Sequence, residues 1–74
     1  MKYKVTRTDG TPIPEDEPCF VIRAQDEFAV DIIQHYIDFT RGTVSADTTG
    51  NILAHRERIR DWQIKNADKV KIPD

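Results

Sequence analysis

The sequence predicts a small α+β domain in which an antiparallel β-hairpin is followed by two α-helices. Two N-terminal segments have strand-like patterns, a strongly apolar helical pattern follows them, and a polar loop precedes a second, narrower helical pattern. Both helices are expected on one face of the hairpin, which is the usual two-layer way of burying a sheet face. The 74 residues are expected to form a single domain, 1–74.

The two expected strands come first. Lys2–Arg7 alternates between polar and apolar residues, with Tyr3 and Val5 on one face, as in a half-buried strand. Asp9–Gly10 then marks a turn. The second strand is expected at Cys19–Arg23, because this nearly continuous apolar run is typical of a strand that is covered on both faces.

The two helices follow from apolar residues at helical spacing. The first is expected over Asp26–Arg41, with an acidic N-terminus and with Gly42 directly after its end. The second is expected over Ile52–Asn66, and Lys69–Asp74 alternates in a way that allows a further short edge strand. The candidate N-caps of the second helix are Thr48, Thr49 and Asn51.

The first helix carries apolar residues on two ridges. One ridge holds Phe28, Ala29, Ile32, Tyr36 and Phe39, and the other holds Val30, Ile33 and Ile37. The expected sheet covers one ridge and the second helix offers only a narrow stripe, so a chain this short leaves the second ridge exposed. We therefore expect Val30, Ile33 and Ile37 to form the interface of a homo-oligomer. The alternative is that the second helix and Val70–Ile72 cover this ridge within one subunit.

Composition and charge exclude several classes of function. The net charge of −2 hides an acidic block, because residues 8–47 hold nine acidic and two basic residues. The chain lacks the basic excess of a protein that binds duplex nucleic acid. We expect neither a signal peptide nor a membrane span, because no apolar run has the required length. With Cys19 as its single cysteine, the chain is expected to be cytoplasmic.

Residue types that serve catalysis are present without the necessary arrangement. Cys19 starts an apolar strand pattern after three acids, which is the setting of a small buried hydrophobe rather than a nucleophile. His35 and His55 lie on helices, and the acids spaced around His35 are placed to stabilise its helix. One cysteine and two histidines are too few for a closed zinc site. We expect a binding protein with no catalytic residues, no metal and no cofactor.

Two segments carry residue types that bind phosphorylated ligands. Arg23 and Gln25 lie where the second expected strand meets the start of the first helix, a favoured position for an anion. The second segment runs from His55 to Arg60 and is followed by Trp62. Arg56 and Arg60 share one face of the second helix, and Arg58 points elsewhere, near His55 and Trp62. Arginines together with aromatic rings hold nucleotides by phosphate contacts and base stacking. A further stacking residue is expected in Tyr36.

Each of these segments has a structural alternative. Arg23 can pair with the acids at the start of the first helix, which already occupy the helix end that an anion would need. Arg56 and Arg60 can face the acids of the first helix, and Trp62 can belong to the core of so small a domain.

The order of these elements resembles that of small, uncharacterised accessory proteins of bacteriophages and prophages. In those proteins a strand of the form E-P-x-F-V-x-R-x-x-D leads into a helix, and the matching residues are Glu17, Pro18, Phe20, Val21, Arg23 and Asp26. The resemblance covers most of the chain and implies an accessory function for a phage. Phage proteins of this size often counteract host immunity, either by blocking a host protein or by sequestering nucleotide second messengers.

The predicted function combines these observations. We expect a non-enzymatic protein that counteracts host defence by sequestering a phosphorylated nucleotide in a pocket at an oligomer interface. The first alternative is an inhibitor that docks on a host protein through the acidic surface of residues 9–47. The second alternative is a structural or regulatory phage component without a small ligand.

Overall fold

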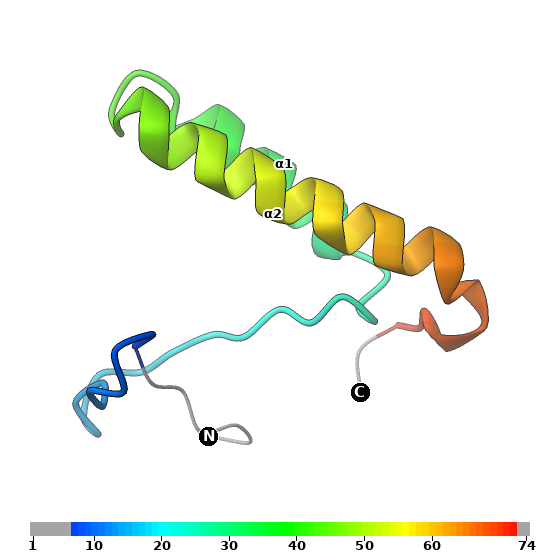
Figure 1. The fold of residues 1–74 in the computed structure, drawn as a ribbon, viewed down its shortest axis with the longest axis horizontal. Helices are drawn as coiled ribbons and strands as arrows, with labels where there is room; N and C mark the ends of the chain where they lie inside the picture. Colours follow the sequence, from blue (N-terminus) through cyan, green and yellow to red (C-terminus); the bar gives the residue numbers. More distant parts are fainter. Residues whose placement is uncertain (1–6, 73–74) are drawn as a thin grey trace.

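Two α-helices connected by a short loop form the main body of the protein (Figure 1). Helix α1 spans Ala29–Thr40, helix α2 spans Ala46–Lys65, and a single 3₁₀ turn, η1, spans Ala67–Lys69. The structure is a computed structural model, and it describes residues 7–72. No β-strand is formed within these residues, so the predicted α+β class is wrong and the described part of the chain is all-helical.

The expected β-hairpin is not formed by the residues that the structure describes. Its first strand, Lys2–Arg7, lies outside the described residues except for Arg7. Its second strand, Cys19–Arg23, is an extended segment that passes beneath the helices in Figure 1 and has no strand partner among residues 7–72. An apolar, β-branched run forms a strand only where a neighbouring strand offers its backbone groups. Here the described residues place the run beside helix α2 and not beside a strand.

The C-terminal segment returns to the start of α1 through one backbone bridge. Asp26 and Lys71 form a single parallel β-bridge. The Lys71 amide donates to the Gln25 carbonyl at 2.9 Å, and the Lys71 carbonyl accepts from the Glu27 amide at 2.9 Å. The edge strand that Lys69–Asp74 allowed is therefore reduced to one bridge after the η1 turn, with residues 73–74 outside the described part.

Helix α1 starts three residues later than the sequence predicts. The Asp26 carboxylate accepts from the Phe28 amide at 2.8 Å and holds a turn ahead of the helix, so the first helical residue is Ala29. At the other end, the Thr40 hydroxyl donates to the Tyr36 carbonyl at 2.8 Å. Gly42 follows with a φ of +86°, so its predicted place directly after the helix is confirmed.

Helix α2 starts six residues earlier than the sequence predicts. Ser45 is its N-cap, and the Ser45 hydroxyl oxygen accepts from the Thr48 amide at 3.1 Å. The three predicted caps therefore lie inside the first turns of the helix. The helix ends at Lys65, where the Asn66 amide bonds to the Trp62 carbonyl at 2.9 Å, one residue before the predicted end.

The core lies between the two helices. Among residues 7–72 the buried apolar side chains are Ala29, Ile37 and Ile59, and Ile37 is only 1% exposed. Val30 and Ile33 are half-buried on the same ridge of α1. The ridge that was expected to be an open interface is therefore the core ridge, because no sheet covers the other side of α1 and α2 packs on this one. The opposite ridge is left exposed at Phe28, Ile32, Tyr36 and Phe39.

Candidate functional site

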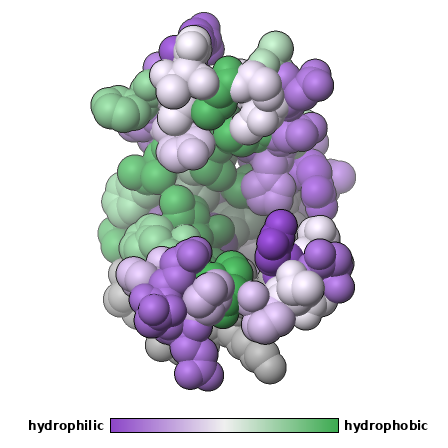
Figure 2. All heavy atoms as spheres, turned by 90° about the vertical axis from the view of Figure 1, so that its left-hand side faces the viewer, coloured by the Kyte–Doolittle hydropathy of each residue, from purple (hydrophilic) through white to green (hydrophobic). Residues whose placement is uncertain are grey.

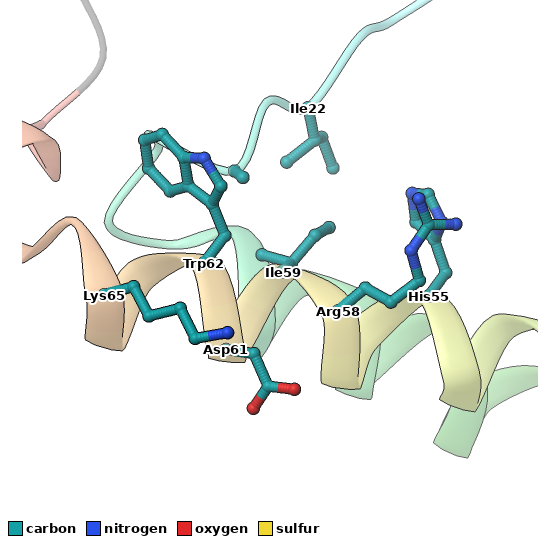
Figure 3. A pocket seen from close by; sticks show the side chains of 8 residues that line it. Ile22, His55, Arg58, Ile59, Asp61, Trp62 and Lys65 are labelled. Carbon is teal, nitrogen blue, oxygen red and sulfur yellow. The ribbon is translucent and has the colours of Figure 1, made fainter.

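An open groove lies between α2 and the extended segment that precedes α1 (Figure 3). Its volume is about 490 Å³, which falls in the range of small-molecule sites. The extended segment contributes Ile22 and Ala24 to the lining. Helix α2 contributes the other lining residues, which are His55, Arg58, Ile59, Asp61, Trp62 and Lys65. We call this site the Trp62 groove.

The helical repeat explains why these α2 residues meet at one groove. His55, Arg58, Ile59 and Trp62 follow the three- and four-residue spacing that places side chains on one helix face. Ile59 is buried beneath the groove and Trp62 is half-buried at its wall. Figure 3 shows Ile59 and Trp62 pointing from α2 toward Ile22, so the floor between the two elements is apolar.

Gln63 fixes the extended segment in place across from α2. Its Nε2 group donates to the Ala24 carbonyl at 3.0 Å and to the Asp26 carbonyl at 2.9 Å. These carbonyls belong to a segment without regular secondary structure, so the side chain supplies partners that a strand would otherwise supply. The sequence contained no signal for this role, because a glutamine on a polar helix face is ordinarily solvated.

The polar side chains of the Trp62 groove are arranged unevenly. Figure 3 shows His55 and Arg58 extending on the Ile22 side, at the end of the groove away from Trp62. Asp61 points away from Ile22, and Lys65 extends along α2 toward Asp61. The face beside the apolar floor therefore presents an arginine and a histidine, while the groove's one carboxylate lies on the outer side.

A second hollow of about 550 Å³ lies between the start of α1 and the end of α2. Glu27 and Asp31 line it together with Arg60 and Gln63. Its apolar lining comes from Val30, Ile64, Ala67 and Val70. The two carboxylates next to one arginine make this hollow a poorer place for an anion than the Trp62 groove.

The six residues predicted to bind a ligand are not brought together. Trp62 lines the groove, whereas Arg60 lines the second hollow near Asp31. Arg56 turns toward α1, where its Nη1 group donates to the Gln34 side chain. The Arg56 guanidinium also contacts the Glu57 carboxylate at 2.6 Å.

The other three predicted ligand residues lie outside the groove lining. Tyr36 is on the exposed ridge of α1. Gln25 uses its backbone carbonyl to accept from Lys71. Arg23 is exposed, and it stands in the chain between the lining residues Ile22 and Ala24. His55 and Arg58 also line the groove, and they belong to the candidate segment although neither was among the six predicted ligand residues. The lining residue that the sequence reasoning missed is Lys65.

The Asp9 carboxylate has a lowered pKa in the N-terminal turn. The Thr11 hydroxyl donates to Asp9 Oδ1 at 2.7 Å, and the Thr11 amide donates to the same oxygen at 3.0 Å. Both hydrogen bonds favour the ionised form and hold the pKa of Asp9 below its ordinary value of 3.8. Neither residue lines the Trp62 groove, so the lowered pKa of Asp9 is a property of the N-terminal turn and not of the groove.

Residues 7–72 carry neither a metal-binding cluster nor a membrane-spanning helix. These residues contain no group of three or more histidine, cysteine, aspartate or glutamate side chains arranged to hold a metal ion. Neither helix combines the length and the apolar character needed to cross a bilayer.

Comparison with known proteins gives no relatives. No protein family model matches the chain, and no match is found among curated proteins or solved structures. The resemblance to phage accessory proteins therefore stays a prediction.

Proposed function

We propose that this protein binds a small anionic ligand with an aromatic ring, of the phosphorylated-nucleotide class, in the Trp62 groove and without catalysing a reaction. The observation that carries the proposal is the shared placement of Trp62 and Arg58 along one open, apolar-floored groove. An aromatic ring stacks on indole, and a guanidinium forms paired hydrogen bonds with a phosphate.

The spacing of the two side chains fits such a ligand. Arg58 and Trp62 are four residues apart on α2, which is roughly 6 Å along a helix axis. A base stacked on the Trp62 indole then directs its phosphate along the groove toward Arg58 and His55. Ile22 and Ile59 supply the apolar contact for the sugar and ring edges. The groove is built within one chain, so the proposed pocket does not need the oligomer interface that the sequence suggested.

Thermal shift and calorimetric titration test the proposal. The panel contains ADP, ADP-ribose, and cyclic mono- and dinucleotides, and at least one member is expected to raise the melting temperature. A ligand that binds only the folded state adds about 2.7 kcal/mol of stability at one hundred times its Kd. Stabilisation by none of the panel would overturn the proposal.

Two matched arginine variants locate the site. Arg58→Ala is expected to weaken binding by roughly ten- to a hundred-fold, the usual loss for a hydrogen bond to a charged group. Arg60→Ala removes the same side chain from the same helix but on the second hollow, and it is expected to leave binding unchanged. Equal losses in both variants would show that the effect is general charge attraction rather than the Trp62 groove.

A second proposal rests on the acidic block. Of the nine acids in residues 8–47, all but Asp26 are exposed. Exposed carboxylates attract a basic partner protein, as expected for an inhibitor of a host protein. Asp31 and Asp38 are both exposed on α1. Reversing their charges is expected to abolish salt-sensitive binding to such a partner without changing the affinity for nucleotides. Unchanged capture of the same partner by the reversed variant would contradict this second proposal.

A further inference from the structure

An apolar stripe runs along one face of α1 from its N-cap residue, and each of its side chains is about half exposed or more. The stripe consists of Phe28, Ile32, Tyr36 and Phe39, with exposed fractions of 46%, 48%, 55% and 90%. At about 100° per residue these four positions fall within an arc of about 80°. Figure 2 shows hydrophobic side chains gathered on one side of the molecule and mainly hydrophilic ones on the other. We call this surface the α1 stripe.

We propose that the α1 stripe is the interface of a homodimer in which the α1 helices of two copies pack antiparallel. The stripe shares no residue with the Trp62 groove, so this proposal is independent of the proposed ligand. Its occupant is a second copy of the chain, for three reasons that follow from area, spacing and charge.

The area of the stripe matches what a stable dimer needs. With roughly 200 Å² for each large side chain, the four exposed fractions leave about 480 Å² of apolar surface on each copy. Two copies then bury about 960 Å² of apolar area. This apolar area alone is close to the roughly 1,000 Å² that a specific interface needs.

The spacing of the stripe is self-complementary. An interface around a two-fold axis must present the same patch on both copies. An axis midway between Ile32 and Tyr36 places Ile32 against the partner's Tyr36 and brings Phe28 within about one residue of the partner's Phe39. The aromatic rings then meet at both ends of the stripe, and the smaller isoleucines lie beside the tyrosines in the middle.

The charges beside the stripe favour the antiparallel arrangement. Asp31 and His35 are exposed and flank the stripe on the same side. Antiparallel packing brings Asp31 near the partner's His35, and the two-fold axis repeats this contact. A parallel pair would place this flank against the opposite flank of the partner, so Asp31 would not lie near the partner's His35, and it would also align the two helix dipoles unfavourably.

The small core of one copy adds a reason for association. Only three apolar side chains are buried among residues 7–72. Domains of this size bury a low fraction of their surface, and oligomerisation is one of the usual ways in which they gain stability. Covering the stripe extends the core from α1 across the two-fold axis.

Sedimentation and light scattering of the full chain test the proposal. The wild-type protein is expected to have twice the monomer mass of 8.6 kDa. Ile32→Asp places a charge at the centre of the interface and is expected to raise the dimer dissociation constant about 30-fold or more. Ile64→Asp is the matched control on α2, because Ile64 is 69% exposed and lies outside the stripe. Phe39→Ser, at the most exposed position, replaces Ile32→Asp if the latter does not fold.

A charge exchange tests the orientation of the helices. Asp31→Lys is expected to weaken the dimer because the carboxylate that lies near the partner's His35 is lost. Adding His35→Glu is expected to restore the dimer, because a lysine and a glutamate then face each other across the interface. A monomeric wild type at high concentration, an assembly larger than two copies, or equal losses in Ile32→Asp and Ile64→Asp would overturn the dimer. Failure of the second substitution to restore association would overturn the antiparallel arrangement.

Discussion

Replacing Ile37 with alanine is expected to destabilise the protein more than any comparable change at an exposed isoleucine. The side chain is 1% exposed, and the substitution removes three carbon atoms from the contact between α1 and α2. At about 0.8 kcal/mol per buried methylene, the transfer cost is about 2.4 kcal/mol, and the cavity left behind raises the total to about 3 kcal/mol. A domain of this length has about 4–11 kcal/mol of stability in total, so the loss is a large fraction of it.

The comparison is made by urea denaturation followed by far-UV circular dichroism at one fixed protein concentration. Ile64→Ala is the control, because a side chain that is 69% exposed loses only about 0.8 kcal/mol on the same scale. If Ile37→Ala does not fold, Ile37→Val is expected to cost about 1 kcal/mol. Equal losses at the two isoleucines would refute the reasoning, since they would place Ile37 on the surface where the sequence first suggested it.

Three further changes test local features of the structure. Ser45→Ala removes the N-cap of α2 and is expected to cost about 1 kcal/mol of unfolding free energy in the same denaturation assay, whereas Ser45→Asp is expected to retain most of it. Gln63→Ala removes two hydrogen bonds to the extended segment, so hydrogen exchange at the Lys71 amide is expected to accelerate, and an unchanged rate would contradict the anchoring role. Thr11→Val removes the main donor to Asp9, and an NMR titration is expected to show the Asp9 pKa rising toward 3.8. In the wild type this pKa is depressed, so the stabilisation from the turn is present above pH 3.8 and is lost as the pH falls through the lowered value.

The helices were the part of the fold that the sequence predicted best. Their existence follows from apolar residues at helical spacing, and Gly42 marks the end of α1 because its positive φ suits glycine. The start of α2 was misplaced because Thr48, Thr49 and Gly50 have low helix propensity and resemble loop residues. The Ser45 cap and the packing of the helix against α1 override that local preference.

The β-hairpin was the main error, and its cause is physical. The run Cys19–Arg23 has the composition of a central strand, but composition indicates only which side chains favour burial. Whether another strand is present to share backbone hydrogen bonds depends on distant parts of the chain. Here α2 and the Gln63 side chain take over that role for the segment that follows the run.

The error in the fold explains the error in the interface. With a sheet beneath α1, the ridge at Val30, Ile33 and Ile37 would face outward. Without a sheet, α2 takes that ridge and the ridge at Ile32 and Tyr36 faces outward instead. The prediction that α1 has more apolar surface than one small subunit covers survives this exchange, because it depends on the helix alone.

The ligand residues were only partly predictable. Arginine near tryptophan was recognised as a nucleotide-binding composition, but Arg56 and Arg60 were chosen where the groove uses Arg58. The choice depends on which face of α2 meets α1, and a helix with few apolar residues does not define that face from its sequence. Arg56 contacts Gln34 of α1, whereas Arg58 lines the groove, so the two arginines lie on different faces of α2.

The fluorescence of Trp62 tests the central proposal most directly. The chain contains one tryptophan, and its indole forms a wall of the groove, so its emission reports on this site alone. Titration with the nucleotide that gives the largest thermal shift is expected to quench the emission, with a saturation curve that gives the same Kd as calorimetry and that Arg58→Ala moves to higher concentration. Calorimetric binding without any change in Trp62 emission would place the ligand elsewhere and would contradict the proposed site.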